Sequence, residues 1–398
     1  MNQNLFARRL ASMSGSVIRE ILKLTQQPDM ISFAGGLPSP DSFPREELTE
    51  IVTEIIAQKG SSVLQYGTTE GYQPLREFIA DWVKERGIEA DPSEVLIISG
   101  SQQGLDLMGK AFIDPGDNVL VEDPTYLAAL QIFTAYEANF TSIPTDNLGP
   151  IPAKIKEVAQ GNKINKLIYL IPTFQNPTGI TMPVERRQEV VSVAEELGLV
   201  LMEDDPYGEL RYSGEPVPAL KSFDTKGSVV YLGSFSKIIS PGLRVGYIIG
   251  NQEIIRKLTI GKQTVDLHTS NLSQAIVYEY CSRGLLPKHL AKIRAQYKEK
   301  RDLMLKLLEE NFPPEVTWTK PEGGLFLWME LPQGISTTEL LKEAIKEKVA
   351  FIPGDSFFPH GGGSNTIRLN FSNATKNDLE QGITRMAKVT KQFLSRQK

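Results

Sequence analysis

Between about residues 45 and 285 the sequence alternates short apolar runs with longer amphipathic stretches, and this alternation constrains the fold more than any other feature. Such runs are typical of buried strands, and strands that alternate with helices form a mostly parallel sheet with helices on both faces. Three runs, at 167–172, 199–202 and 228–233, are followed by polar side chains. Ligands bind at the carboxyl ends of strands in such sheets, so we expect a binding site there.

The third run ends in Ser234-Phe235-Ser236-Lys237, and Arg244 follows shortly after. A lysine beyond a strand end is usually a solvated charge, but two hydroxyls and a guanidinium nearby favour another interpretation. Pyridoxal 5'-phosphate (PLP) binds covalently to a lysine amine, and its phosphate needs hydroxyl and cationic donors. Arginine suits a fixed phosphate because its planar fork donates two parallel bonds. We therefore interpret Lys237 as a cofactor lysine, with Ser234, Ser236 and Arg244 at the phosphate.

The second run ends in three consecutive acids, Glu203, Asp204 and Asp205, with Tyr207 close behind. An acid in this position can pair with the pyridine nitrogen of PLP, keep it protonated and let the ring act as an electron sink. Spacing alone does not separate the three acids, and we choose Asp204. Tyr207 can donate to the phenolate oxygen of the cofactor.

The first run leads into Gln175-Asn176-Pro177-Thr178-Gly179. Asn176 precedes a proline, which biases it towards an extended conformation and projects its amide from the strand end. Such a stretch alone is more often a plain turn. Because it comes before the acid and the lysine in that order, we expect Asn176 to lie beside the phenolate oxygen.

A fourth apolar run, 95–98, is followed by Gly100, Ser101 and Gln102 and then by a helical pattern. Unpaired backbone N–H groups and the dipole at a helix N-terminus favour a bound anion. We expect this turn to contribute to the phosphate site.

With these residues in place, the chain resembles the fold type I, PLP-dependent aminotransferases of class I/II over nearly all of its 398 residues. Within that family it is most similar to the branch of the 2-aminoadipate (lysine-biosynthesis) and kynurenine/aminoadipate aminotransferases. Besides the Lys237 segment, the match is carried by Ile18–Leu24, Ser32–Pro38, Leu64–Tyr66, Thr69–Tyr72 and Phe174–Gly179.

The resemblance implies a role for each matching position. The catalytic residues would be Lys237, Asp204 and Tyr207. Tyr126 would stack on the cofactor ring, and Tyr66 would reach the phosphate from the partner subunit of a homodimer. The cofactor-binding set implied in this way is Gly100, Ser101, Gln102, Tyr126, Asn176, Asp204, Tyr207, Ser234, Ser236, Lys237, Arg244 and Tyr66.

The resemblance also implies a substrate site formed by Arg368, Arg19, Gly36 and Asn176. Arg368 interrupts a strand-like run, where a charged side chain usually faces solvent. An amino acid, however, brings a carboxylate that must be fixed in register with Lys237, and a bidentate arginine is the usual solution. Arg19 resembles the arginine that reads a distal carboxylate in the related branch; the alternative is a surface arginine on an amphipathic helix.

Composition excludes several other classes of protein. A net charge of −5 with mixed signs argues against nucleic acid or an anionic membrane as the main partner. No apolar run approaches the roughly 18 residues of a membrane span. Cys281 is the only cysteine, which suits a reducing cytoplasm. The three histidines, His268, His289 and His360, fit no metal-ligand spacing, so we expect no metal.

The length allows two domains. The alternating region, 45–285, would be a large PLP-binding domain with an α/β fold. The resemblance implies a seven-stranded type of sheet in it and a smaller α+β domain formed by 1–44 and 286–398. A helix over 286–310 would lead into the small domain. Its predicted strands are Val316–Trp318, Leu325–Trp328, Val349–Ile352 and Thr366–Phe371, with a helix near the C-terminus. Residues 1–30 carry arginines and serines, but we expect a helix of the mature protein there and not a targeting segment.

We expect ping-pong transamination of an L-amino acid with a 2-oxo acid, most simply 2-oxoglutarate. The preferred donor is 2-aminoadipate or a broad set of acidic, branched-chain and aromatic amino acids. One alternative is another fold type I PLP enzyme, a β-lyase or decarboxylase, because these share the cofactor residues. A non-enzymatic effector-binding regulator is disfavoured because the sequence leaves no room for a DNA-binding domain.

Overall fold

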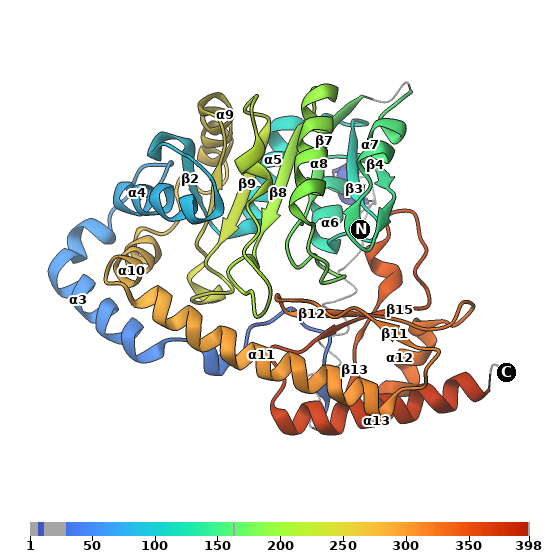
Figure 1. The fold of residues 1–398 in the computed structure, drawn as a ribbon. Helices are drawn as coiled ribbons and strands as arrows, with labels where there is room; N and C mark the ends of the chain where they lie inside the picture. The colour runs from blue at the N-terminus through green and yellow to red at the C-terminus, as the bar shows by residue number, and fades with distance from the viewer. Residues whose placement is uncertain (1–6, 12–28, 162–163, 397–398) are drawn as a thin grey trace.

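The computed structural model describes residues 7–11, 29–161 and 164–396 (Figure 1). Arg19 and the predicted helix around it lie outside these residues. The helices are α1 (Arg8–Ala11), α3 (Arg45–Val63), α4 (Gln73–Trp82), α5 (Ser101–Phe112), α6 (Leu127–Thr134), α7 (Pro152–Val158), α8 (Val184–Leu197), α9 (Gln252–Gln263), α10 (Asn271–Ser282), α11 (Leu285–Asn311), α12 (Thr337–Lys346) and α13 (Lys376–Ser395). None of them is both long and apolar enough to cross a membrane.

A seven-stranded sheet forms the centre of the larger part of the molecule, in the order β2-β10-β9-β8-β7-β3-β4. Only β10 runs antiparallel to its neighbours, so the predicted mostly parallel sheet is confirmed. The strands are β2 (Val95–Ile98), β3 (Asn118–Glu122), β4 (Asn139–Ile143), β7 (Asn165–Leu170), β8 (Val200–Asp205), β9 (Val229–Ser234) and β10 (Gly246–Ile249).

Helices cover both faces of this sheet because its strands are apolar on both sides (Figure 1). Successive side chains of a strand point to opposite faces, and β7 shows this clearly. Leu167 and Tyr169 pack in the core cluster that includes residues of α5, α6 and α9. Ile168 and Leu170 pack in the cluster that includes residues of α7 and α8.

A second sheet is small and antiparallel, in the order β11-β12-β15-β14, with β11 (Thr317–Trp318), β12 (Phe326–Glu330), β14 (Ile352–Pro353) and β15 (Thr366–Asn370). The prediction of one strand over Val349–Ile352 is wrong. The chain changes partner at the buried Phe351, so that β13 (Val349–Ala350) pairs in parallel with β1 (Ile31–Ser32), whereas β14 pairs with β15. A further short hairpin joins β5 (Thr145–Asp146) and β6 (Gly149–Pro150).

The segment around β1 belongs with the small sheet by its hydrogen bonds. The backbone N–H of Phe33 donates to Ala350, and the N–H of Asn370 donates to the carbonyl of Phe33. α11 runs from the large sheet to the small one and packs against α13 (Figure 1). The exact domain boundaries stay a prediction.

Candidate active site

A cavity of about 280 Å³ lies where the carboxyl ends of the large sheet's parallel strands face the small sheet. It is lined by Gly36, Leu37, Ser101, Gln102, Leu105, Tyr126, Ile171, Asn176, Asp204, Pro206, Tyr207, Ser234, Ser236, Lys237, Pro241, Arg244, Phe326 and Arg368. Residues far apart in the sequence therefore meet in one place. Of the predicted site residues that the structure describes, Gly100 and Tyr66 are outside this lining.

Lys237 follows the end of β9 and reaches across the cavity. Its Nζ donates to the carbonyl oxygen of Gly36 at 2.9 Å. Burial, together with the nearby positive charges of Arg244 and Arg368, lowers the pKa of Lys237 to about 8. An amine in this environment is available as a neutral base or nucleophile close to neutral pH.

The three consecutive acids at the end of β8 have different surroundings, because neighbouring side chains of a strand point to opposite faces. Asp204 alone lines the cavity. Glu203 accepts hydrogen bonds from the backbone N–H groups of Leu220 and Lys221 at 2.9 Å. Asp205 accepts from Arg86 at 2.5 Å and from Tyr231 at 2.9 Å, away from the cavity.

Asp204 has one oxygen bonded and one free. Its Oδ2 accepts from the hydroxyl of Tyr169 at 2.8 Å, while Oδ1 is buried and has no hydrogen-bond partner in the described structure. Burial raises the pKa of Asp204 to about 7, although the bond from Tyr169 opposes the shift. A buried carboxylate oxygen without a partner is costly, so this atom suits a cationic or N–H donor supplied by a ligand.

The first turn of α5 offers an anion site at one end of the cavity. Gly100 is the N-cap residue, with φ +82°, and no side chain caps the helix. The N–H of Gln103 donates back to the carbonyl of Gly100 at 3.0 Å, so the N–H groups of Ser101 and Gln102 are the ones that this turn offers to an anion. Ser101, Gln102 and Arg244 line the cavity beside this turn, and Arg244 Nη2 donates to the carbonyl of Ser99 at 3.0 Å. A Cβ at Gly100 would stand 2.4 Å from Arg244 Nη2, so only glycine permits this approach.

Arg368 enters the cavity from β15 of the small sheet and is almost completely buried. Its Nη1 donates to Asn176 Oδ1 at 2.9 Å, and its Nη2 donates to the carbonyl of Ala34 at 2.8 Å. The guanidinium lies over the rings of Phe326 and Phe357, at 4.3 and 5.0 Å from their centroids. Burial lowers the pKa of Arg368 to about 10, which leaves the group cationic at neutral pH.

Two tyrosines complete the lining. Tyr126 is the N-cap residue of α6, and Tyr207 packs edge-on against Phe326 with ring centroids 5.8 Å apart. Burial raises the pKa of both phenols, so each is a hydrogen-bond donor at neutral pH.

Tyr66 is not brought to the cavity within one chain. It is 78% exposed, and its ring meets the ring of His268 edge-on at 5.9 Å. Leu64, which is 69% exposed, lies just before it in the chain.

Sequence reasoning missed Tyr169, Phe326 and the backbone carbonyl of Ala34. A tyrosine within an otherwise aliphatic buried strand was a signal for Tyr169, because a buried phenol needs a hydrogen-bond partner. Phe326 and Ala34 carry no polar side chain, so no signal in the sequence pointed to them.

The residues present fit PLP. The cavity has a helix N-terminus without a side-chain cap at α5, a buried acid with an unpartnered oxygen, an amine with a depressed pKa and room for a small ligand. The first three of these features suit the phosphate, the pyridine nitrogen and the aldehyde carbon of the cofactor, in that order.

Comparison with known proteins gives a consistent result. Residues 28–386 match the family of class I and II aminotransferases. The chain is 47% identical to aromatic-amino-acid aminotransferase 1 of Thermococcus litoralis, covering 98% of this chain and 95% of that protein. It is 43% identical to the 2-aminoadipate transaminase of Thermus thermophilus, covering 98% and 97%. A crystal structure of Pyrococcus horikoshii kynurenine aminotransferase, with PMP and kynurenine, superimposes with a TM-score of 0.94 at 46% identity, covering 98% and 97%.

Proposed function

The chain belongs to the class I and II aminotransferases and is a PLP-dependent aminotransferase, and from that premise we propose which residues hold the cofactor and which amino acids react. When bound, PLP supplies an electron sink that makes the α-proton of an amino acid acidic. The remaining steps depend on side chains of this protein.

We assign the phosphate to the N-terminal turn of α5 and to Arg244 beside it. Gly100 allows Arg244 to approach this turn, and Ser101, Gln102, Ser234 and Ser236 add donors around it. The N–H groups of Ser101 and Gln102 and the guanidinium of Arg244 together favour a dianion.

The cofactor ring is assigned to the space between Asp204 and Tyr126. The unpartnered Oδ1 of Asp204 is the observation that carries this assignment, because it is the acceptor that a protonated pyridine nitrogen needs. A cation at that point would lower the pKa of Asp204 and keep the carboxylate ionised. Asn176 and Tyr207 supply donors for the phenolate oxygen.

Lys237 Nζ is the group that moves the proton. Its depressed pKa supplies the neutral amine, which would take the proton from the α-carbon of the amino acid and donate it to the C4′ carbon of the cofactor. Arg368 holds the α-carboxylate through its guanidinium, with Asn176 and Gly36 beside it, so that the proton lies within reach of Lys237.

We propose a broad range of donors, from aromatic and branched-chain amino acids to 2-aminoadipate, with 2-oxoglutarate as the acceptor. Relatives named for aromatic amino acids, 2-aminoadipate and kynurenine support this range. Leu37 and Phe326 give the cavity apolar surface for a large side chain. The cations among the described lining residues are Lys237, Arg244 and Arg368, so a distal carboxylate depends on Arg19.

The visible spectrum of the purified holoenzyme tests this proposal. We expect glutamate, 2-aminoadipate, leucine and kynurenine each to convert the cofactor band to the amine form, and 2-oxoglutarate to restore it. Conversion by a single donor would reject broad specificity. Loss of carbon dioxide or of the side chain, in place of a released 2-oxo acid, would indicate a decarboxylase or a lyase.

Arg19→Ala separates the two kinds of donor. If Arg19 binds the distal carboxylate, kcat/KM falls for 2-aminoadipate and stays unchanged for leucine. Equal changes for the two donors would remove Arg19 from the substrate site.

We also propose a homodimer in which Tyr66 completes the phosphate site of the partner subunit. The exposure of Tyr66 and Leu64 outside the cavity supports this arrangement, since large apolar side chains gathered on a surface often mark an interface. A cytoplasmic location is proposed on the single, buried Cys281, which needs no oxidising compartment.

A further inference from the structure

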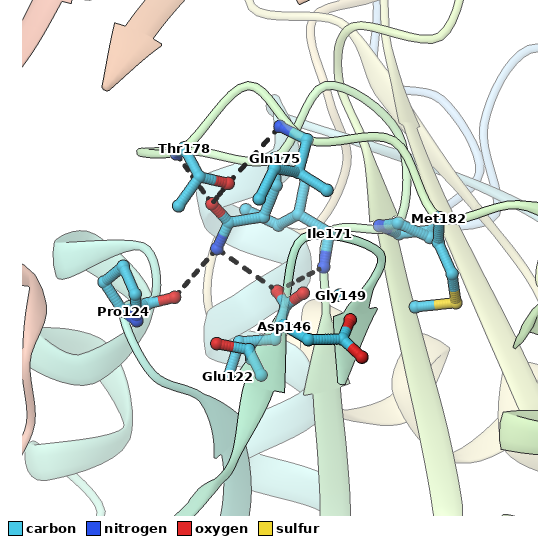
Figure 2. A pocket seen from close by; sticks show the side chains of 11 residues that line it. Glu122, Pro124, Asp146, Gly149, Ile171, Gln175, Thr178 and Met182 are labelled. Carbon is cyan, nitrogen blue, oxygen red and sulfur yellow. Dashed lines mark hydrogen bonds between the residues drawn. The ribbon is translucent and has the colours of Figure 1, made fainter. Parts of the chain in front are cut away.

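The side-chain amide of Gln175 joins its own loop to the segment at the end of β3, beside the active site, as Figure 2 shows. Its Nε2 donates to the carbonyl of Pro124 at 2.9 Å and to Glu122 Oε2 at 3.4 Å. Its Oε1 accepts from the backbone N–H of Thr178 at 2.8 Å and from the Thr178 hydroxyl at 2.7 Å. Gln175 is only 4% exposed, so water does not replace these bonds.

The first consequence concerns the loop that carries Asn176. Gln175 Oε1 accepts from both donors of Thr178, and these two bonds fix the conformation of the loop on either side of Asn176. Asn176 in turn accepts from Arg368. The position of the substrate arginine is therefore connected to the amide of Gln175.

The second consequence concerns the loop that carries Tyr126. The bond to Pro124 fixes the backbone two residues before Tyr126, the N-cap residue of α6. The next residue, Thr125, donates its N–H to the carbonyl of Phe357, and Arg368 lies over the Phe357 ring. Both loops that Gln175 holds thus meet at Arg368.

Glu122 anchors this arrangement at the end of β3. It is 3% exposed, and its Oε2 also accepts from the backbone N–H of Ile171 at 3.0 Å. Ile171 lines both the active-site cavity and a small cavity of about 20 Å³ next to Glu122 (Figure 2). Burial raises the pKa of Glu122 to about 8, so the carboxyl is mostly protonated near neutral pH and can be buried without a counter-ion.

We propose that Gln175, anchored on Glu122, is a positioning residue for transamination, which sets Asn176 and Tyr126 in register with each other. The inference rests on the proposed roles of Asn176 and Tyr126. The role proposed for Gln175 differs from a purely structural one. Its amide connects the loops of Asn176 and Tyr126, which are proposed to contact ligands, and does not connect two elements of the core.

The test compares Gln175→Leu with Asn118→Leu. Asn118 begins β3, at the end opposite to Glu122, and is an equally buried amide that bonds to Asn165 at 2.6 Å and to Thr141 at 3.0 Å. Both changes remove buried hydrogen bonds and are expected to lower Tm. Only Gln175→Leu is expected to raise the KM for the donor and the Kd for PLP, roughly 10-fold each, since the buried bonds are lost at the ligand loops.

A further measurement and a further pair of variants report on the position of the two loops and not on stability. The visible circular dichroism of bound PLP is expected to change in Gln175→Leu and to stay unchanged in Asn118→Leu. Glu122→Gln keeps an acceptor for Ile171 and Gln175 and is expected to resemble the wild type, whereas Glu122→Leu is expected to resemble Gln175→Leu.

Asn176→Ala, measured in the same assays, separates the positioning role of Gln175 from the proposed role of Asn176. If Asn176→Ala raises KM while Gln175→Leu shows only the lowered Tm of Asn118→Leu, the positioning role is overturned and the proposed function stands. If Asn176→Ala leaves Kd and KM unchanged, the proposed role of Asn176 fails, and the inference fails with it.

Discussion

Arg368 and Asn176 are 192 residues apart in the sequence, and their side chains are joined by a hydrogen bond of 2.9 Å inside the active site. The bond connects β15 of the small sheet with the loop after β7 of the large sheet. It leaves Arg368 Nε buried and without a partner in the described structure. The guanidinium is therefore oriented before substrate arrives, and this reduces the entropy lost on binding.

Arg368→Lys is expected to lower kcat/KM for every donor by about 10²–10³, because an ammonium cannot replace the planar fork between Asn176 and the substrate carboxylate. PLP affinity should change little. Arg211→Lys is the matched control, since Arg211 also lies over a ring, that of Phe174 at 4.8 Å, but outside the cavity. Equal losses of kcat/KM in Arg368→Lys and Arg211→Lys would contradict the assignment of Arg368 to the substrate carboxylate.

Lys237→Ala is expected to bind PLP and to lose roughly 10³-fold or more in kcat, because it lacks the base that moves the α-proton. Borohydride should attach PLP covalently to the wild type and not to the variant, as measured by mass spectrometry. Lys262→Ala, which alters another buried lysine, should keep the label. Near-normal turnover of Lys237→Ala would reject its role.

Gly100→Ala is expected to weaken PLP binding by at least about 10-fold, since the new methyl group would meet Arg244 at the proposed phosphate site. Gly116→Ala introduces a side chain at a similar positive φ, +94°, where no atom lies within 4 Å, and controls for backbone strain. Affinity for pyridoxal, which lacks the phosphate, should be nearly equal in Gly100→Ala and the wild type. If Gly100→Ala weakened the binding of pyridoxal as much as that of PLP, the defect would not lie in contacts with the phosphate.

The stability of the apoenzyme should depend on pH through Lys237. Its pKa is about 8 in the folded protein and near 10.5 when exposed, so the unfolded chain binds more protons between these values and stability rises with pH. Lys237→Met should therefore be more stable than wild type at pH 7, by up to about 3 kcal/mol, with the difference shrinking between pH 8 and 10.5. Urea denaturation measures this, with the exposed Lys306→Met as control. If the difference in unfolding free energy between Lys237→Met and wild type did not change with pH, the lowered pKa of Lys237 would be contradicted.

Mixing two impaired variants tests the proposal that the active site is shared between two subunits. Lys237→Ala and Tyr66→Ala are expected to be impaired separately. After subunit exchange, half the dimers combine one of each, and one of their two sites carries both native residues, so about a quarter of wild-type activity returns. If Tyr66 acts within its own subunit, mixing restores nothing.

The sequence by itself determined the sheet and the candidates at its edge. Apolar runs of strand length separated by amphipathic helices leave few alternatives to a mostly parallel sheet, and the polar residues that end these runs must then meet at one edge. Lys237, Asn176 and Arg244 could be named for that reason, and so could one of three consecutive acids.

Only the tertiary structure decided which acid faces the cavity and what surrounds Arg368. The pleat of β8 turns Asp204 to the side opposite Glu203 and Asp205, and this orientation depends on how the strand is packed in the sheet. The contacts of Arg368 with Asn176 and Phe326 form between two sheets, and local sequence preferences carry no information about such a junction. Burial, which shifts the pKa values of Lys237 and Asp204, is likewise a property of the packed chain and not of the residues alone.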